Sequence, residues 1–86
     1  MTKGSGFLEI KLTISGMQED PTIPRNVKER LREIFEILEK DGDISLKVDK
    51  SIQLLDEIND DSNLQSYTRT QVWNLVSVLE KNRLVS

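Results

Sequence analysis

The fold of this chain is decided by two stretches: Asp20-Pro-Thr-Ile-Pro-Arg25, running on to Leu38-Glu39, and Asp61-Ser-Asn-Leu-Gln-Ser66, running on to Leu79-Glu80. The second begins 41 residues after the first (61 against 20), and the two align without a gap. In each, a polar turn precedes apolar residues at helical spacing. The coinciding apolar positions are Ile23/Leu64, Leu31/Val72, Ile34/Leu75, Phe35/Val76, Ile37/Val78 and Leu38/Leu79. The match predicts two copies of one helix pair.

Apolar periodicity predicts three helices directly. The first of them starts after Thr22 or Asn26, either of which is a good N-cap residue, and runs to about Lys40. The other two cover about 44–58 and about 66–82. Gly42, in the turn after Lys40, suits a backbone conformation of positive φ.

The segment 7–18 has two competing patterns. Alternation typical of a half-buried strand is seen at Leu8, Ile10, Leu12 and Ile14. One face of a helix would instead gather Phe7, Ile10, Ile14 and Met17. Local sequence leaves the two readings even. The repeat favours the helix, because Ile14 aligns with Leu55 and Met17 with Ile58 in the third helical segment.

These elements predict an all-α chain, a four-helix bundle built from two HEAT-like helix pairs. Repeat one covers about 7–40 and repeat two about 44–82, within a single helical domain over 7–86 that follows a flexible N-terminus at 1–6. A period of 40 to 47 residues is typical of HEAT-type solenoids, which usually need three or more copies for stability. With two copies, we expect the chain to close into a bundle or to cover its exposed stacking face by self-association.

Composition argues against most chemistries. The 86 residues include no cysteine and no histidine, so thiol nucleophiles, disulfides and the common base near neutral pH are excluded. We therefore expect no enzyme, no cofactor and no bound small molecule. The net charge of −3 disfavours non-specific binding to nucleic acid. No apolar run approaches about 20 residues and no secretory signal is visible, which predicts a cytoplasmic protein without a membrane span.

Two acidic clusters in the sequence resemble metal sites in part. In the segment 39–50, acidic groups stand at the first, third and fifth positions of a calcium-type loop. The position that requires glycine is Ile44, however, and the position that requires a bidentate glutamate is Lys50. The second cluster comprises Asp56, Glu57, Asp60 and Asp61. We interpret both clusters as solvated surface and assign no metal ligand.

Three motifs resemble those of a known family. They are Asp20-Pro-Thr-Ile-Pro-Arg-Asn-Val27, Leu54-Leu-Asp-Glu-Ile-Asn-Asp60 and Arg69-Thr-Gln-Val-Trp-Asn74 followed by Val78-Leu-Glu80. Over about residues 18 to 82, the chain is similar to uncharacterised protein family 0147, small proteins of archaea. The resemblance implies a helical, cytoplasmic protein of archaeal type and brings no activity with it.

Candidate partner-binding residues fall in two groups. Arg25, Lys28 and Arg32 form a basic stripe at the start of the second helix, where they either contact a partner or form a solvated face, Arg32 pairing with Glu36. Arg69 and Trp73 lie one turn apart in the fourth helix, at a spacing that allows guanidinium–indole stacking.

For Trp73, we favour packing at the edge of the core over an interface role. The leading functional hypothesis is a non-enzymatic module that self-associates or docks on another protein through Arg69, Trp73 and their neighbours. The alternative is a nucleic-acid or ribosome-associated accessory protein that uses the basic stripe.

Overall fold

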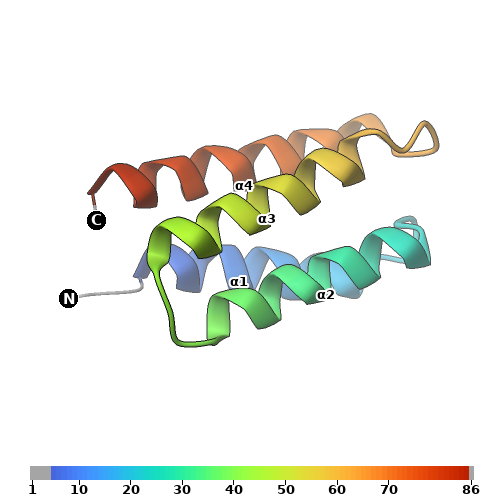
Figure 1. Ribbon diagram of the computed structural model, residues 1–86. Coiled ribbons are helices and arrows are strands. Elements are labelled where there is room, and N and C mark those ends of the chain that lie inside the picture. Colours follow the sequence, from blue (N-terminus) through green and yellow to red (C-terminus); the bar gives the residue numbers. More distant parts are fainter. Residues whose placement is uncertain (1–4, 86) are drawn as a thin grey trace.

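The structure, a computed structural model, describes the backbone of residues 5–85 and the side chains of residues 7–82. Across that part of the chain there are four α-helices and no strand (Figure 1). The helices are α1 (Ser5–Gln18), α2 (Arg25–Glu39), α3 (Ile44–Asn59) and α4 (Ser66–Val85). The all-α prediction is confirmed. The connections are short, so consecutive helices run antiparallel and the outer ends of α1 and α4 lie at the same end of the molecule.

The ambiguous first segment is a helix. Ile10, Ile14 and Met17 are each about 1% exposed, whereas Leu8 and Leu12 point outward. This is the helical face that the repeat favoured, and the alternating strand pattern is wrong. Helix α1 already begins at Ser5, so residues 5 and 6 belong to it and not to the predicted N-terminal segment; residues 1–4 lie outside the described part.

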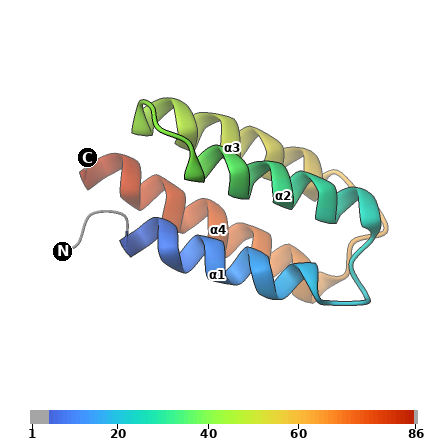
Figure 2. The ribbon, with the colours of Figure 1, turned by 90° about the horizontal axis from the view of Figure 1, so that it is seen from below.

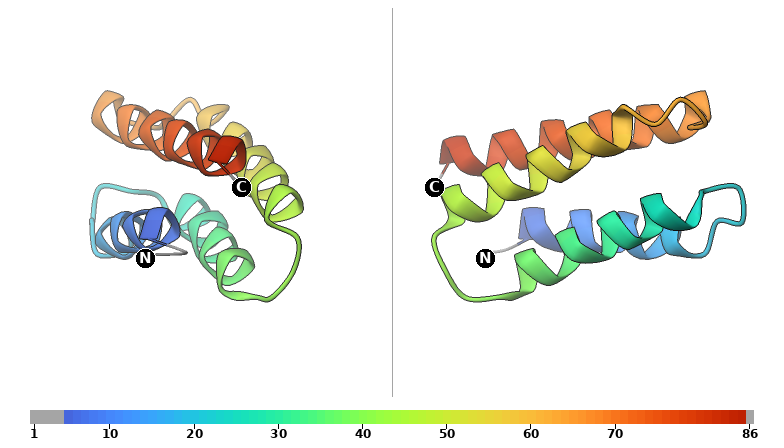
Figure 3. Two further views of the ribbon diagram at one scale, coloured as in Figure 1. Left: turned by 90° about the vertical axis from the view of Figure 1, so that its left-hand side faces the viewer. Right: turned by 45° about the vertical axis from the view of Figure 1, so that its right-hand side comes forward.

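Each helix contacts its two neighbours in a ring. Close backbone contacts join α1 to α2, α2 to α3, α3 to α4 and α4 back to α1, while the backbones of the diagonal pairs α1/α3 and α2/α4 do not approach each other over the described residues. One side chain crosses a diagonal, since Lys47 Nζ of α3 lies 5.9 Å from the ring centroid of Phe7 of α1. Figure 2 separates the α2–α3 pair from the α1–α4 pair, and Figure 3 (left) shows the ring from one end. A solenoid stack would instead place α1 beside α3 and α2 beside α4. The two helix pairs therefore close on each other, an arrangement compatible with the predicted bundle.

The two halves bury equivalent side chains. The pairs that lie 41 residues apart and are buried in both halves are Ile10/Ser51, Ile14/Leu55, Met17/Ile58, Ile23/Leu64, Val27/Thr68, Leu31/Val72, Ile34/Leu75 and Leu38/Leu79. Each fully buried Val, Leu or Ile side chain contributes about 1.5–3 kcal/mol relative to exposure. The apolar members of these pairs, together with Val48, form the core, which is drawn from all four helices and from the turns at 19–24 and 60–65.

The two inter-helix turns at 19–24 and 60–65 are built from equivalent hydrogen bonds. The amide of Asp20 donates to the carbonyl of Met17, and the amide of Asp61 donates to that of Ile58. Each aspartate carboxylate then accepts from the amide two residues on, that of Thr22 at 2.9 Å and that of Asn63 at 2.9 Å. The repeat found in the sequence thus extends to backbone geometry.

The start of α2 differs from the prediction. Its N-cap is Pro24, whose side chain makes no capping bond, and Asn26 lies inside the helix. Thr22 is used in the turn instead, because its hydroxyl and its amide both donate to the carboxylate of Asp20. In the α2–α3 connection, Gly42 takes the predicted positive φ, at +146°.

Hydrogen bonds in these turns lower two carboxyl pKa values. The hydroxyl and the amide of Thr22 hold the pKa of Asp20 below its ordinary value of 3.8. The amide of Asn63, and then the side chain of Asn26, do the same to the pKa of Asp61. In each case the bonds favour the charged form of the carboxyl group.

Acid is therefore expected to weaken the fold through these two turns. Because the unfolded carboxyls bind protons more readily, the free energy of unfolding should be unaffected by them above about pH 5 and should fall as pH drops below about 4. Urea unfolding across this range measures the slope. Asp20→Asn and Asp61→Asn keep a hydrogen-bond acceptor but do not titrate, so each should make the slope shallower. Slopes equal to that of the parent protein would contradict the role of these turns.

Candidate interaction surface

The structure does not bring the two groups of predicted site residues together. Arg25, Lys28 and Arg32 lie on α2, and Arg69 and Trp73 lie on α4. These helices are diagonal in the ring, and their backbones do not approach each other within the described residues. The two groups are therefore separate surfaces, and each has to be judged by itself.

The basic stripe lies among acidic side chains. Helix α2 carries four basic and four acidic residues, and Arg25 and Arg32 are exposed. The expected pair between Arg32 and Glu36 does not form in the described structure. Arg30 pairs with Glu57 of α3 instead, at 3.3 Å. The stripe is thus a mixed-charge surface and not a concentrated positive patch.

Arg69 is used inside the molecule. Its Nη1 donates to the carbonyl of Asn59 at 2.6 Å and its Nη2 donates to the carbonyl of Asp61 at 2.9 Å. These carbonyls lie at the C-terminal end of α3, where cationic donors stabilise a helix. Arg69 is therefore a positioning residue of the turn. The guanidinium–indole stacking that the spacing allows does not form in the described residues, where the cations that lie over aromatic rings are Lys11, over Phe35, and Lys47, over Phe7.

Trp73 projects from the bundle. Its side chain is 62% exposed, so the favoured interpretation, packing at the edge of the core, is wrong. The reason lies in the ring: Val72, Leu75 and Leu79 fill the face of α4 that meets the interior, which leaves Trp73 beyond its margin. An exposed tryptophan on a helix keeps the interface role open.

Further apolar side chains are exposed on α1 and α4. Leu8 and Leu12 on α1 are 54% and 64% exposed, and Tyr67 on α4 is 67% exposed. Charge is sparse here: α1 carries only Glu9 and Lys11, and α4 carries a single charge, that of Arg69, between Ser66 and Leu79. Sequence reasoning missed Leu8, Leu12 and Tyr67, because which face of α1 is buried depended on the unsettled choice between helix and strand.

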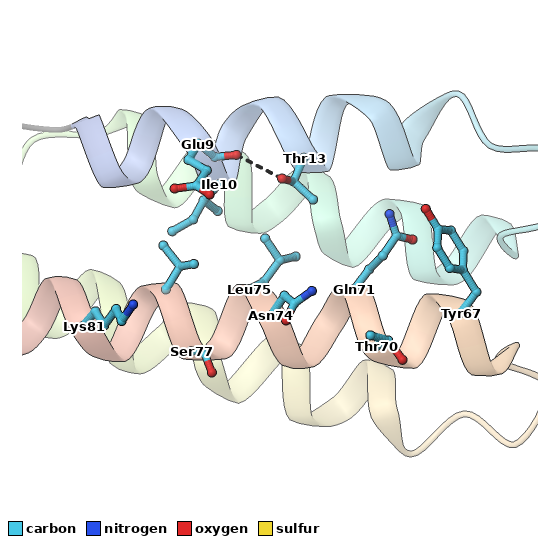
Figure 4. A pocket seen from close by; sticks show the side chains of 11 residues that line it. Glu9, Ile10, Thr13, Tyr67, Thr70, Gln71, Asn74, Leu75, Ser77 and Lys81 are labelled. Carbon is cyan, nitrogen blue, oxygen red and sulfur yellow. Dashed lines mark hydrogen bonds between the residues drawn. The ribbon is translucent and has the colours of Figure 1, made fainter.

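A groove of about 530 Å³ runs between α1 and α4 (Figure 4). Its walls are mostly uncharged and polar. They are formed by Glu9, Ile10 and Thr13 from α1 and by Tyr67, Thr70, Gln71, Asn74, Leu75, Ser77, Val78 and Lys81 from α4. Tyr67 stands at one end of the α4 wall and Lys81 at the other.

The groove between α1 and α4 corresponds, in the repeat, to the line of contact between α2 and α3, which is closed by side-chain bonds. We call these two lines of contact the α1–α4 seam and the α2–α3 seam. In the α2–α3 seam, Arg30 pairs with Glu57 at 3.3 Å, and Asn26 Nδ2 donates to Asp61 at 3.3 Å. The offset of 41 residues between the halves gives the equivalent positions in the α1–α4 seam. Arg30 and Glu57 correspond to Gln71 and Gly16, and Asn26 and Asp61 correspond to Tyr67 and Asp20. Neither of these pairs is bonded in the described structure.

Gly16 and Gln71 show what is missing from this seam. A Cβ added at Gly16 would meet nothing within 4 Å, and the Oε1 atom of Gln71 is buried without a hydrogen-bond partner in the described residues. A buried unpaired polar atom is destabilising. The alignment of the two halves could have indicated this difference from the sequence alone, since it sets glycine against Glu57 and glutamine against Arg30.

The described part of the chain offers neither a metal site nor a membrane span. No group of three or more carboxylates gathers there in a way that could hold a metal ion. None of the helices over residues 5–85 combines the length and apolar character needed to cross a membrane.

Comparison with known proteins places the chain in a family. The model of an uncharacterised protein family, UPF0147, matches residues 4–81. A UPF0147 protein from Archaeoglobus fulgidus is 38% identical over 76 residues, which covers 88% of this chain and 87% of the relative. Another from Methanosarcina mazei is 37% identical over 68 residues, 78% of this chain and 73% of the relative.

A solved structure agrees with the fold. The crystal structure of the unknown function protein MMP1188 matches with a TM-score of 0.85 at 30% identity, covering 92% of this chain and 91% of that one. The chain is thus a small protein with four helices over its described residues and with relatives in archaea. The chain belongs to the uncharacterised family UPF0147, and the resemblance seen in its motifs is confirmed.

Restoring the missing bridge should couple the two walls of the groove. Gly16→Glu combined with Gln71→Arg reproduces the Arg30–Glu57 pair, whose side chains are 41% and 46% exposed. The double variant should be about 0.2–1 kcal/mol more stable than the sum of the single changes predicts, as for other exposed pairs. Chemical unfolding of the four proteins of this cycle measures the coupling.

Gly16→Ala serves as the control for helix propensity. It should stabilise the chain by about 0.5–1 kcal/mol without coupling to position 71. A coupling of zero between Gly16→Glu and Gln71→Arg would mean that these positions do not face each other.

Proposed function

We propose that this protein is a non-enzymatic interaction module that binds a protein partner through the surface formed by α1 and α4. The observation that carries the proposal is the exposure of Trp73 on a helix that is almost free of charge from Ser66 to Leu79. Charged residues are depleted at the cores of protein interfaces, while tyrosine and tryptophan are enriched there. Truncating a buried interface tryptophan is often among the most costly changes.

Trp73 and the groove belong to one surface. Thr70 and Ser77 line the groove and stand three residues before and four residues after Trp73. Residues three and four apart are neighbours on a helix. A partner that covers Trp73 therefore also reaches the rim of the groove, where hydroxyl and amide groups can bond to it.

The predicted HEAT-like character is part of this proposal. We propose that the chain holds two HEAT-like helix pairs, a reading supported by the 41-residue offset between equivalent buried residues and equivalent turn bonds. Solenoids of this kind use their helix faces to bind proteins. The cytoplasmic location expected from the sequence belongs to the same proposal.

Nucleic-acid association is the weaker alternative. It would use Arg25, Lys28 and Arg32, two of which are exposed. Glu29, Glu33 and Glu36 lie on the same helix, however, and their charges oppose the approach of a phosphate backbone. Retention of labelled RNA in a gel shift at low salt would favour this alternative over the protein partner.

Substitution of Trp73 tests the interaction surface. Affinity capture from an extract of the source organism should recover a specific partner with the parent protein, and Trp73→Ala should lower its recovery about tenfold or more. Arg32→Ala is the matched control, because Arg32 is the exposed residue at the equivalent position of the other half. Circular dichroism should find both variants folded. Equal recovery by all three proteins would contradict the proposal.

A further inference from the structure

We infer that the α1–α4 groove is an interface for a second copy of this chain, related to the first by a two-fold axis that passes near Thr13 and Asn74. The inference rests on the proposed function, and it identifies the molecule that occupies the groove as a second copy of the chain. A two-fold interface needs a surface that complements itself, so that each contact occurs twice. The α4 wall of the groove, which runs from Tyr67 to Lys81, has this property.

The middle of the groove follows from the register of the helices. In the closed seam, Arg30 meets Glu57 and Asn26 meets Asp61, so facing residue numbers add up to 87. The equivalent register in the α1–α4 seam sets Thr13 opposite Asn74. Along α4, Tyr67 and Lys81 are each seven residues, about two helical turns, from Asn74. The centre of the α4 wall is therefore at Asn74, and Thr13, the last residue of the α1 wall, lies opposite it.

The two ends of the groove are chemically complementary. Rotation about an axis at Asn74 brings Tyr67 of each copy to the end of the other copy where Glu9 and Lys81 lie. A phenol hydroxyl can donate to the carboxylate of Glu9, and the ring face can accept the ammonium of Lys81. Tyr67 is 67% exposed and is free to make these contacts without rearrangement of the core.

The centre of the groove avoids repulsion between identical surfaces. Thr70, Asn74 and Ser77 line it, and all three are uncharged hydrogen-bonding residues. The equivalent positions in the other half are Glu29, Glu33 and Glu36. A two-fold axis at Glu33 would place the three carboxylates of one copy against those of the other, where they repel each other. An axis at Asn74 instead places uncharged amide and hydroxyl groups of the two copies against each other. Of these two sides, the α1–α4 side is therefore better suited to pair with itself.

A single engineered cysteine tests the position of the axis. The chain has no cysteine of its own, so Asn74→Cys introduces the only thiol. Residues beside a two-fold axis can approach within the roughly 7 Å between Cα atoms that a disulfide requires. Under mild oxidation, Asn74→Cys should form a covalent dimer at least ten times faster than Glu33→Cys, the exposed equivalent on α2. Equal rates would overturn the inference.

Sedimentation of the cysteine-free protein gives an independent measurement. A concentration-dependent monomer–dimer equilibrium is expected, with Tyr67→Ala weakening it at least tenfold and Asn26→Ala, at the equivalent position, leaving it unchanged. A monomer at every concentration, or equal effects of the two changes, would overturn the inference.

Failure of the inference and failure of the proposed function give different results. If Asn74→Cys does not cross-link faster than its control while partner capture still depends on Trp73, the second copy is wrong and the interaction module stands. If cross-linking is specific but capture does not depend on Trp73, the self-pairing groove stands and the proposed partner surface falls.

Discussion

The structure depends on one constraint, the burial of two equivalent apolar stripes against each other. Neither helix pair can cover its own stripe, because two helices leave one side of the pair open to water. Closing the pairs on each other gives Leu31, Val72, Leu55 and their equivalents a common interior. The ring of close backbone contacts between neighbouring helices follows from this closure. The tight turns, each fixed by an aspartate, then hold the helices of each pair in register.

Equivalent backbones have come to carry different surfaces. The α2–α3 seam is closed by Arg30–Glu57 and by Asn26–Asp61, while the α1–α4 seam has Gln71, Gly16 and Tyr67 at the corresponding places. A groove lies on the side where the described residues form no such bridges, in a bundle whose two halves bury equivalent positions. Since a core of this kind needs only apolar side chains of suitable volume, the outer positions were free to change without loss of the fold.

Much of the fold could be predicted from the sequence, and less of the candidate site. Helical periodicity located α2, α3 and α4, and alignment of the halves decided the helix at α1, because Ile14 and Met17 had partners in α3. For the polar candidate residues, the sequence was less informative. Arg69 lies in a turn and bonds two carbonyls there, and the stripe of Arg25, Lys28 and Arg32 is interrupted by acids. Residue type alone could not distinguish a guanidinium used for folding from one that is free to bind.

By itself, the sequence determined the number of helices, their buried faces and the relation between the two halves, because these depend on local spacing and on apolar character. Only the tertiary structure decided whether the pairs stack or close, and thereby which outer faces remain uncovered. The fate of Trp73 illustrates the difference. The sequence shows that Trp73 lies beside the apolar stripe from Val72 to Leu79. The exposed fraction of its side chain, however, depends on how far the neighbouring helices extend over that part of α4. This is a property of packing between distant segments, which no local pattern encodes.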